Sequence, residues 1–218
     1  MAHSFPPEFF KRQDERPDRD FYAYPRFVTH IDDAAIEAVT CLYKDMLPEG
    51  GRLLDLMSSW VSHLPDDIEY EEVVGLGMNG EELSRNPRLA RFDVHDLNDN
   101  PRLPYRSSSF DAAMCCVSID YLVRPAEVLR DVGRVLKPGA PFVVTFSNRC
   151  FPTKAVTAWL ALDEPSRVGF VEQLFEISGR YGRVTSLDRS PGTGDPLYAV
   201  VGWANTRAAR LGASNHMH

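Results

Sequence analysis

The sequence is poor in cysteine and has no long apolar run. Its four cysteines, at positions 41, 115, 116 and 150, are too few for a disulfide framework and include no C-x-x-C pair, so we expect no structural zinc and no other metal. No apolar stretch reaches the ~18–20 residues that cross a bilayer. Residues 1–7 do not resemble a secretory signal. We therefore expect a soluble, cytoplasmic protein that does not associate with membranes.

An excess of basic residues is also missing. The 218 residues include 24 Lys and Arg against 31 Asp and Glu, a net charge of -7. Such a surface repels phosphate backbones, so we expect no nucleic-acid partner. With 44% hydrophobic and 25% charged residues, the composition is that of an ordinary globular chain and excludes a disordered or collagen-like one. The length is typical of one domain with a full core.

The pattern of apolar residues predicts strands that alternate with helices. Strands are expected at 52–57, 72–77, 89–94, 110–119, 141–148, 184–187 and 197–203, and helices at 32–47, 81–86, 125–135, 154–162 and 166–178. Alternation implies right-handed crossovers and a parallel sheet covered on both faces. The last two strands are joined by a short turn and should pair antiparallel at one edge. We predict a doubly wound α/β domain with a mostly parallel, seven-stranded sheet.

The ends of the chain differ from this body. Residues 1–31 hold four prolines, which prevent a long helix, and many aromatic rings. We expect them to form an N-terminal arm that docks on residues 32–206. Residues 207–218 are polar and are expected to form a flexible tail.

In a doubly wound sheet, ligands bind at the carboxyl ends of the strands. A pyrophosphate site after the first strand is disfavoured, because no glycine-rich turn follows it and Asp55 would lie close to the phosphates. The chain also has no G-x-x-x-x-G-K-[ST] phosphate loop. A cationic ligand without phosphate groups suits these strand ends better.

A series of landmarks in fixed order carries a family resemblance. They are Asp96-Leu97, Leu103-Pro104, Ser109-Phe110-Asp111 and the helix-to-strand segment 127–139, EVLRDVGRVLKPG. In this order and spacing the chain resembles the class I S-adenosylmethionine-dependent methyltransferases, and most of all their type 11 domain, over residues 51–203. The resemblance implies a Rossmann-like fold, S-adenosylmethionine as cofactor and a small-molecule methyl acceptor.

The resemblance also implies where the cofactor binds. Asp55 matches the acid that organises the methionine amino end, and Asp96 matches the acid that accepts from the adenine amino group, with Leu97 against the ring. Val117 and Ser118 match the stretch that lines the sulfonium. The full set of expected cofactor residues is Asp55, Met57, Ser58, Ser59, Trp60, Gly77, Met78, Asn79, Asp96, Leu97, Val117 and Ser118.

Two positions depart from the family pattern. The glycine-rich turn is replaced by residues 56–61, LMSSWV, in which serine hydroxyls could compensate but Trp60 must point away or reshape the pocket. Gly77 stands at the position where the family has the acid that binds the ribose diol. The amide of Asn79 is therefore the candidate replacement, and Met78 would cover the adenine. The alternative is that cofactor binding is lost and the domain is a scaffold or regulatory binding module.

The acceptor end is expected between the arm and the fifth strand. Asp120 or Tyr121 would orient the acceptor or take its proton, although Asp120 could equally be a helix N-cap. Arg149 and Lys154 suggest an anionic group on the acceptor, unless they are surface cations. The expected acceptor residues are Tyr22, Tyr24, Arg26, Asn148 and Arg149, in a monomer or homodimer.

Overall fold

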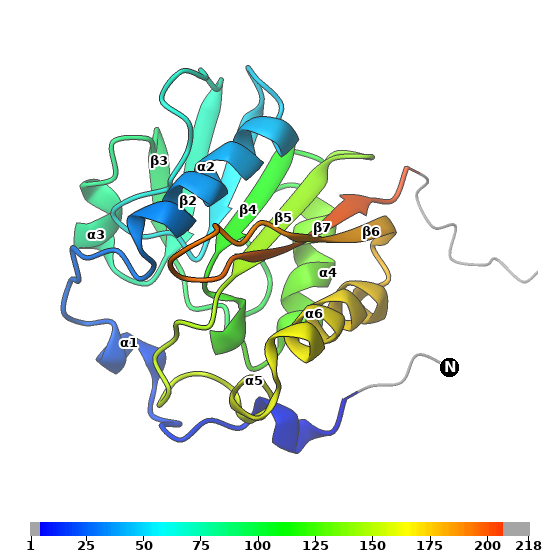
Figure 1. The fold of residues 1–218 in the computed structure, drawn as a ribbon. Helices are drawn as coiled ribbons and strands as arrows, with labels where there is room; N and C mark the ends of the chain where they lie inside the picture. Colours follow the sequence, from blue (N-terminus) through cyan, green and yellow to red (C-terminus); the bar gives the residue numbers. More distant parts are fainter. Residues whose placement is uncertain (1–4, 207–218) are drawn as a thin grey trace, which may run out of the picture.

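A seven-stranded sheet forms the centre of the structure, a computed structural model that describes residues 5–206 (Figure 1). The strands are β1 (Arg52–Leu56), β2 (Glu72–Gly77), β3 (Arg91–Val94), β4 (Ala112–Cys116), β5 (Pro141–Phe146), β6 (Tyr181–Asp188) and β7 (Tyr198–Ala204), in the order β3-β2-β1-β4-β5-β7-β6. Strands β1 to β5 are parallel, and β7 runs antiparallel to both β5 and β6. This arrangement confirms the predicted doubly wound fold and its antiparallel edge.

Helices cover both faces of the sheet. They are η1 (Pro7–Phe10), α1 (Asp18–Phe21), α2 (Asp33–Met46), α3 (Gly80–Ser84), η2 (Ile119–Tyr121), α4 (Pro125–Val135), α5 (Thr157–Ala161) and α6 (Glu164–Ser178). Helix α2 lies on one face, and α4 and α6 lie side by side on the other (Figure 1). Each face has its own apolar cluster, as expected for strands buried on both sides. No helix in residues 5–206 is long and apolar enough to cross a bilayer.

Local sequence explains where several helices begin and end. The side chains of Asp32 and Asp163 accept hydrogen bonds from the first-turn N–H groups of α2 and α6, at 2.9 and 3.0 Å. Helix α6 ends at Gly179, whose φ of 69° is a left-handed conformation that glycine adopts without strain. Strand β4 ends at Cys116, three residues earlier than predicted, because Val117 has a φ of 41° and turns the chain into η2.

The described part of the arm, residues 5–31, runs below α6 and α5 to α1 (Figure 1). The Phe5 ring lies 4.8 Å from Phe170, and the Phe21 ring lies 5.4 Å from Phe151. A bridge between Arg12 and Val156 adds backbone pairing. The tail expected at 207–218 lies outside the described residues.

Candidate functional site

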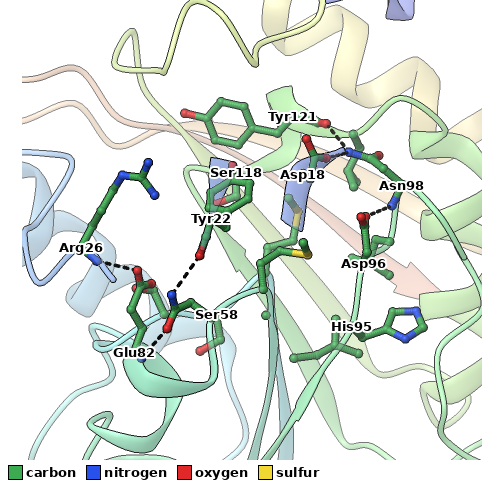
Figure 2. Close-up of a pocket in the computed structure, with 18 of the residues that line it drawn as sticks. Asp18, Tyr22, Arg26, Ser58, Glu82, His95, Asp96, Asn98, Ser118 and Tyr121 are labelled. Atoms are coloured by element: carbon green, nitrogen blue, oxygen red, sulfur yellow. Dashed lines mark hydrogen bonds between the residues drawn. The ribbon is translucent and has the colours of Figure 1, made fainter. Parts of the chain in front are cut away.

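A pocket opens at the carboxyl ends of β1, β2, β3 and β4, where the arm covers part of it (Figure 2). It encloses about 840 Å³, including solvent at its mouth. Most residues predicted to bind the cofactor line it: Met57, Ser58, Ser59, Gly77, Met78, Asn79, Asp96, Leu97, Val117 and Ser118. Tyr22, Arg26 and Tyr121, predicted at the acceptor end, line it as well. The ends of the strands therefore bring together residues from Met57 to Tyr121, which are 64 positions apart in the sequence.

Hydrogen bonds to Asp55 organise the loop without glycines after β1. Asp55 is 4% exposed and lies behind the pocket wall, where its Oδ2 accepts from the hydroxyls of Ser58 and Ser62, both at 2.6 Å. Met57 takes a φ of 57°, a conformation in which glycine would be unstrained. The hydroxyls thus hold a backbone shape that a glycine-rich turn would adopt freely. Asp55, which was expected to organise the methionine end through water or backbone, lies behind the pocket lining.

Trp60 turns away from the pocket. Its Nε1 donates to the carbonyl of Val28 at 3.1 Å, and its ring meets Phe27 edge to face at 6.3 Å. The expectation that it binds cofactor is therefore corrected, because its contacts are with the arm. The pocket volume stays free of this large side chain.

The close approach of two loops leaves Gly77 no room for a side chain. A Cβ there would lie 2.2 Å from the carbonyl oxygen of Ser58. The spacing G-x-G-x-x-G does occur in the chain at 75–80, one strand later than a dinucleotide-binding turn. The structure gives these glycines a packing role, since a Cβ at Gly75 would lie 2.4 Å from Leu89.

A loop after β3 presents Asp96 to the pocket. Asp96 Oδ1 accepts from the backbone N–H groups of Asn98 and Asp99, at 2.9 and 3.3 Å. Within residues 5–206 no hydrogen bond is made to its Oδ2, which is free to accept from a ligand. Asn98 fixes this loop, because its Nδ2 donates to Asp18 at 2.7 Å and to the carbonyl of Tyr121 at 2.9 Å.

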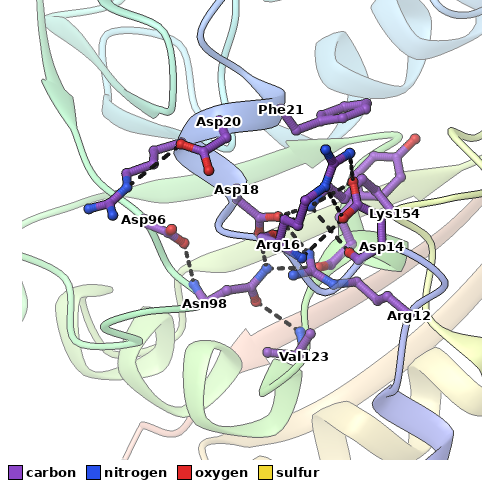
Figure 3. A network of polar contacts seen from close by, with 12 residues as sticks. Arg12, Asp14, Arg16, Asp18, Asp20, Phe21, Asp96, Asn98, Val123 and Lys154 are labelled. Carbon is purple, nitrogen blue, oxygen red and sulfur yellow. Dashed lines mark hydrogen bonds and ion pairs between the residues drawn. The ribbon is translucent and has the colours of Figure 1, made fainter.

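A buried ion network fastens the arm beside the pocket (Figure 3). Asp18 is paired with Arg12 at 2.8 Å and with Lys154 at 3.0 Å. Lys154 is fully buried and donates to the carbonyls of Asp14 and Arg16. Lys154 therefore holds the arm, and the idea that it attracts an anionic acceptor is corrected.

Other residues expected at the acceptor end do not reach the pocket. Tyr24 is 80% exposed, and Asn148 and Arg149 lie outside the pocket lining. Arg149 pairs with Asp195 at 3.1 Å on the surface. The chain after β5 turns away, and Phe151 takes the place on the wall that was predicted for these residues.

Asp120 and Tyr121 occupy different environments. Tyr121 lines the pocket, and its hydroxyl accepts from the N–H of Phe151 at 2.9 Å. Burial raises its pKa far above the ordinary range, so it stays protonated and can orient a ligand but not act as a base at neutral pH. Asp120 is 2% exposed and lies behind the wall, with Oδ2 unpaired. It is therefore not placed to touch an acceptor.

Sequence patterns did not predict several residues that line the pocket: Asp18, His30, Glu82, His95, Asn98 and Phe151. Two of them come from the arm, whose path depends on tertiary contacts. Burial lowers the pKa of His30, so its imidazole is neutral near pH 7. Glu82 lies three residues after the N-cap Asn79, a capping-box spacing that could have drawn attention to it.

Replacing Asp120 with asparagine should change how stability depends on pH. Burial raises the pKa of Asp120 to about 8 from its ordinary value of 3.8, so between these pH values the folded protein keeps a proton that the unfolded chain has lost. The stabilisation that this retained proton gives the folded state is fully present below the unfolded pKa and is lost as the pH rises through 8. The variant should gain up to ~1.4 kcal/mol per pH unit relative to wild type between pH 5 and 8.

Urea unfolding of both proteins at pH 5, 6.5 and 8 measures this difference. Taking the difference cancels other titrating groups such as His30 and His63, whose lowered pKa values act in the opposite direction. Two pH profiles that run parallel would show that Asp120 ionises normally in the folded state.

Comparisons with known proteins find similarity to methyltransferases. Residues 60–144 match a family model described as a methyltransferase domain. The sterol 4-C-methyltransferase strm-1 of Caenorhabditis elegans is 25% identical over 126 residues, which cover 44% of this chain and 38% of that protein. This chain thus matches well under half the length of that relative.

Solved structures share the fold. One belongs to a complex between the Trm112 methyltransferase activator and a methyltransferase of Haloferax volcanii, with a TM-score of 0.61, 19% identity, and coverage of 79% of this chain and 91% of that chain. Another is an S-adenosylmethionine dependent methyltransferase from Mesorhizobium loti, with a TM-score of 0.53, 18% identity, and coverage of 77% and 99%. At such identities they establish the fold alone. Through the family model over residues 60–144 and the shared fold, this chain is similar to the class I S-adenosylmethionine-dependent methyltransferases.

Proposed function

We propose that this protein transfers a methyl group from S-adenosylmethionine to a small-molecule acceptor. The observation that carries the proposal is the pocket at the carboxyl edge of the sheet, from which Trp60 is turned away. An acceptor that is a small molecule suits a pocket partly covered by the arm, and the net charge of -7 disfavours nucleic acid. The name of the sterol methyltransferase relative supports the same class of acceptor.

The residues present suit a cationic nucleoside cofactor. Asp96 and Leu97 would hold the adenine, and the loops at Met57–Ser59 and Val117–Ser118 would surround the methionine end. Met57 and Val117 both have positive φ, and such strained backbone gathers at ligand sites. When bound, the cofactor supplies an electrophilic methyl group on a positively charged sulfur. The pocket carboxylates of Glu82 and Asp96, which form no ion pair within residues 5–206, would complement that charge.

The arm would complete the acceptor end. Tyr22, Tyr121 and Phe151 would exclude water, and Arg26 would bind the acceptor, with its guanidinium 4.5 Å from the Phe21 ring centre. Methyl transfer is an in-line displacement, so orientation of the acceptor supplies most of the acceleration. We assign that orientation to the protonated hydroxyl of Tyr121.

S-adenosylhomocysteine, the demethylated product, should raise the melting temperature. At a hundred times its Kd, a ligand that binds the folded state alone adds about 2.7 kcal/mol of stability. Asp96→Ala should weaken binding by ~1–3 kcal/mol, since a buried charge-assisted hydrogen bond is lost. Asp99→Ala, in the same loop but outside the pocket lining, is the matched control. Thermal shift and calorimetric titration provide the measurements.

A melting temperature unchanged at millimolar ligand would count against the proposal. It would favour the second candidate function, a scaffold or regulatory binding module that keeps the fold without the cofactor. The loop without glycines after β1 is the observation behind that candidate.

A further inference from the structure

A buried carboxylate in the first turn of a helix lines the pocket. Glu82 lies in the first turn of α3, is 8% exposed and lines the pocket. Figure 2 shows its carboxylate below Arg26, with a dashed line joining it to the backbone of that residue. Its helix neighbour Glu81, in contrast, points to solvent and pairs with Arg85 at 2.9 Å.

The two oxygens of Glu82 each have one protein donor. Oε1 accepts from the backbone N–H of Arg26 at 2.7 Å, and Oε2 accepts from the hydroxyl of Ser59 at 2.6 Å. An ionised carboxylate has about four acceptor positions, so about two remain. No Lys, Arg or His side chain within residues 5–206 forms an ion pair with it. A buried carboxylate without a cation is costly, and donors from a ligand would offset that cost.

Neighbouring groups cannot supply the same acceptors. Gly77 has no space for a side chain, because a Cβ would strike the Ser58 carbonyl. Asn79 is fully engaged, since its Oδ1 accepts from the N–H groups of Glu81 and Glu82 and its Nδ2 donates to the carbonyl of Tyr22. These hydrogen bonds leave Asn79 without a free donor or acceptor pair, so it is not available for the diol-binding role that was expected of it.

We propose that Glu82 binds the ribose cis-diol of the cofactor, each carboxylate oxygen accepting one hydroxyl proton. This inference rests on the proposed function, because the diol belongs to S-adenosylmethionine. A carboxylate on α3 replaces the acid that the end of β2 cannot carry. Since Oε1 also holds the backbone of Arg26, the same side chain joins the ribose site to the arm.

A comparison of two ligands tests the proposal. Calorimetric titration with S-adenosylhomocysteine and with its 2′,3′-dideoxy analogue measures what the diol contributes. Wild-type protein should bind the analogue about tenfold or more weakly, as expected for lost hydrogen bonds to a charged group. Glu82→Gln should bind the two ligands with affinities within about twofold of each other, because the amide accepts at one atom and is uncharged. Glu81→Gln, the exposed control, should discriminate as wild type does.

The outcomes separate the two proposals. If wild-type protein does not bind S-adenosylhomocysteine, the proposed function fails, and this inference fails with it. If it binds but does not distinguish the analogue, or if Glu82→Gln distinguishes as well as wild type, the role of Glu82 is overturned and the proposed function stands. Circular dichroism checks that Glu82→Gln is folded. If it does not fold, titration of wild type and Ser59→Ala with the two ligands tests the role of Glu82 instead. Loss of the Ser59 donor should change the discrimination at least twofold if Glu82 holds the diol.

Discussion

Replacing Asp18 with alanine should lower the free energy of unfolding by ~3–5 kcal/mol, the usual cost of leaving a buried ion without its partner. Asp18 is 5% exposed and accepts from Arg12, Lys154 and Asn98, at 2.8, 3.0 and 2.7 Å. Its loss would leave the fully buried Lys154 with its longer 3.6 Å pairing to Asp14. Arg12, whose side chain is 8% exposed, would lose its carboxylate altogether.

The same helix turn offers the control. Asp20 is exposed, and its 3.9 Å pair with Arg19 lies in solvent, so Asp20→Ala should change stability by less than ~1 kcal/mol. Urea unfolding measures both variants. Equal, small effects would mean that the arm is not fastened to the body through this network. Because Asn98 links Asp18 to the loop that presents Asp96, we also expect Asp18→Ala to weaken ligand binding.

Replacing Gly77 with alanine should reduce both stability and ligand binding. The added methyl group would lie 2.2 Å from the Ser58 carbonyl oxygen, a backbone atom that cannot rotate away. Overpacking of this kind costs ~1–3 kcal/mol. The loop at Met57–Ser59 would move into or away from the pocket, so affinity for S-adenosylhomocysteine should fall by about 10-fold or more, roughly the 1.4 kcal/mol equivalent.

Gly80→Ala is the matched control, three residues further along the chain. A Cβ at Gly80 would meet Val94 at 3.4 Å, an ordinary contact, and alanine favours the helix that begins there. This variant should fold and bind like wild type. Urea unfolding and calorimetric titration report the two effects separately. A Gly77→Ala protein with unchanged affinity would show that the loop after β1 does not shape the binding pocket.

Much of the fold could be predicted because its cause is local. The apolar runs at β1 and β2 and the stripe on α4, with Val128 and Val132 both buried, follow from periodicity within one element. The end of β4 could not, because the positive φ of Val117 depends on the loops packed around it. The predicted helix at 154–162 begins only at Thr157, because Val156 has extended backbone and forms a bridge with Arg12 of the arm.

The candidate site divides in the same way. Residues directly after parallel strands, such as Ser58, Asn79, Asp96 and Ser118, were predicted because such strands end at one edge. Residues that reach the pocket from the arm or from within a helix, such as His30 and Glu82, lie at no predictable spacing from that edge. The structure was also needed to identify which of the predicted side chains line the pocket.

The amino-acid sequence by itself determined the doubly wound sheet, its antiparallel edge and the place of the pocket, since each follows from hydrophobic period and from the order of strands and helices. Only the tertiary structure decided that Trp60 contacts the arm, that Lys154 is an internal counter-ion and that Glu82 faces the pocket. Those three outcomes depend on contacts between segments distant in the chain, where burial and charge pairing outweigh any local preference.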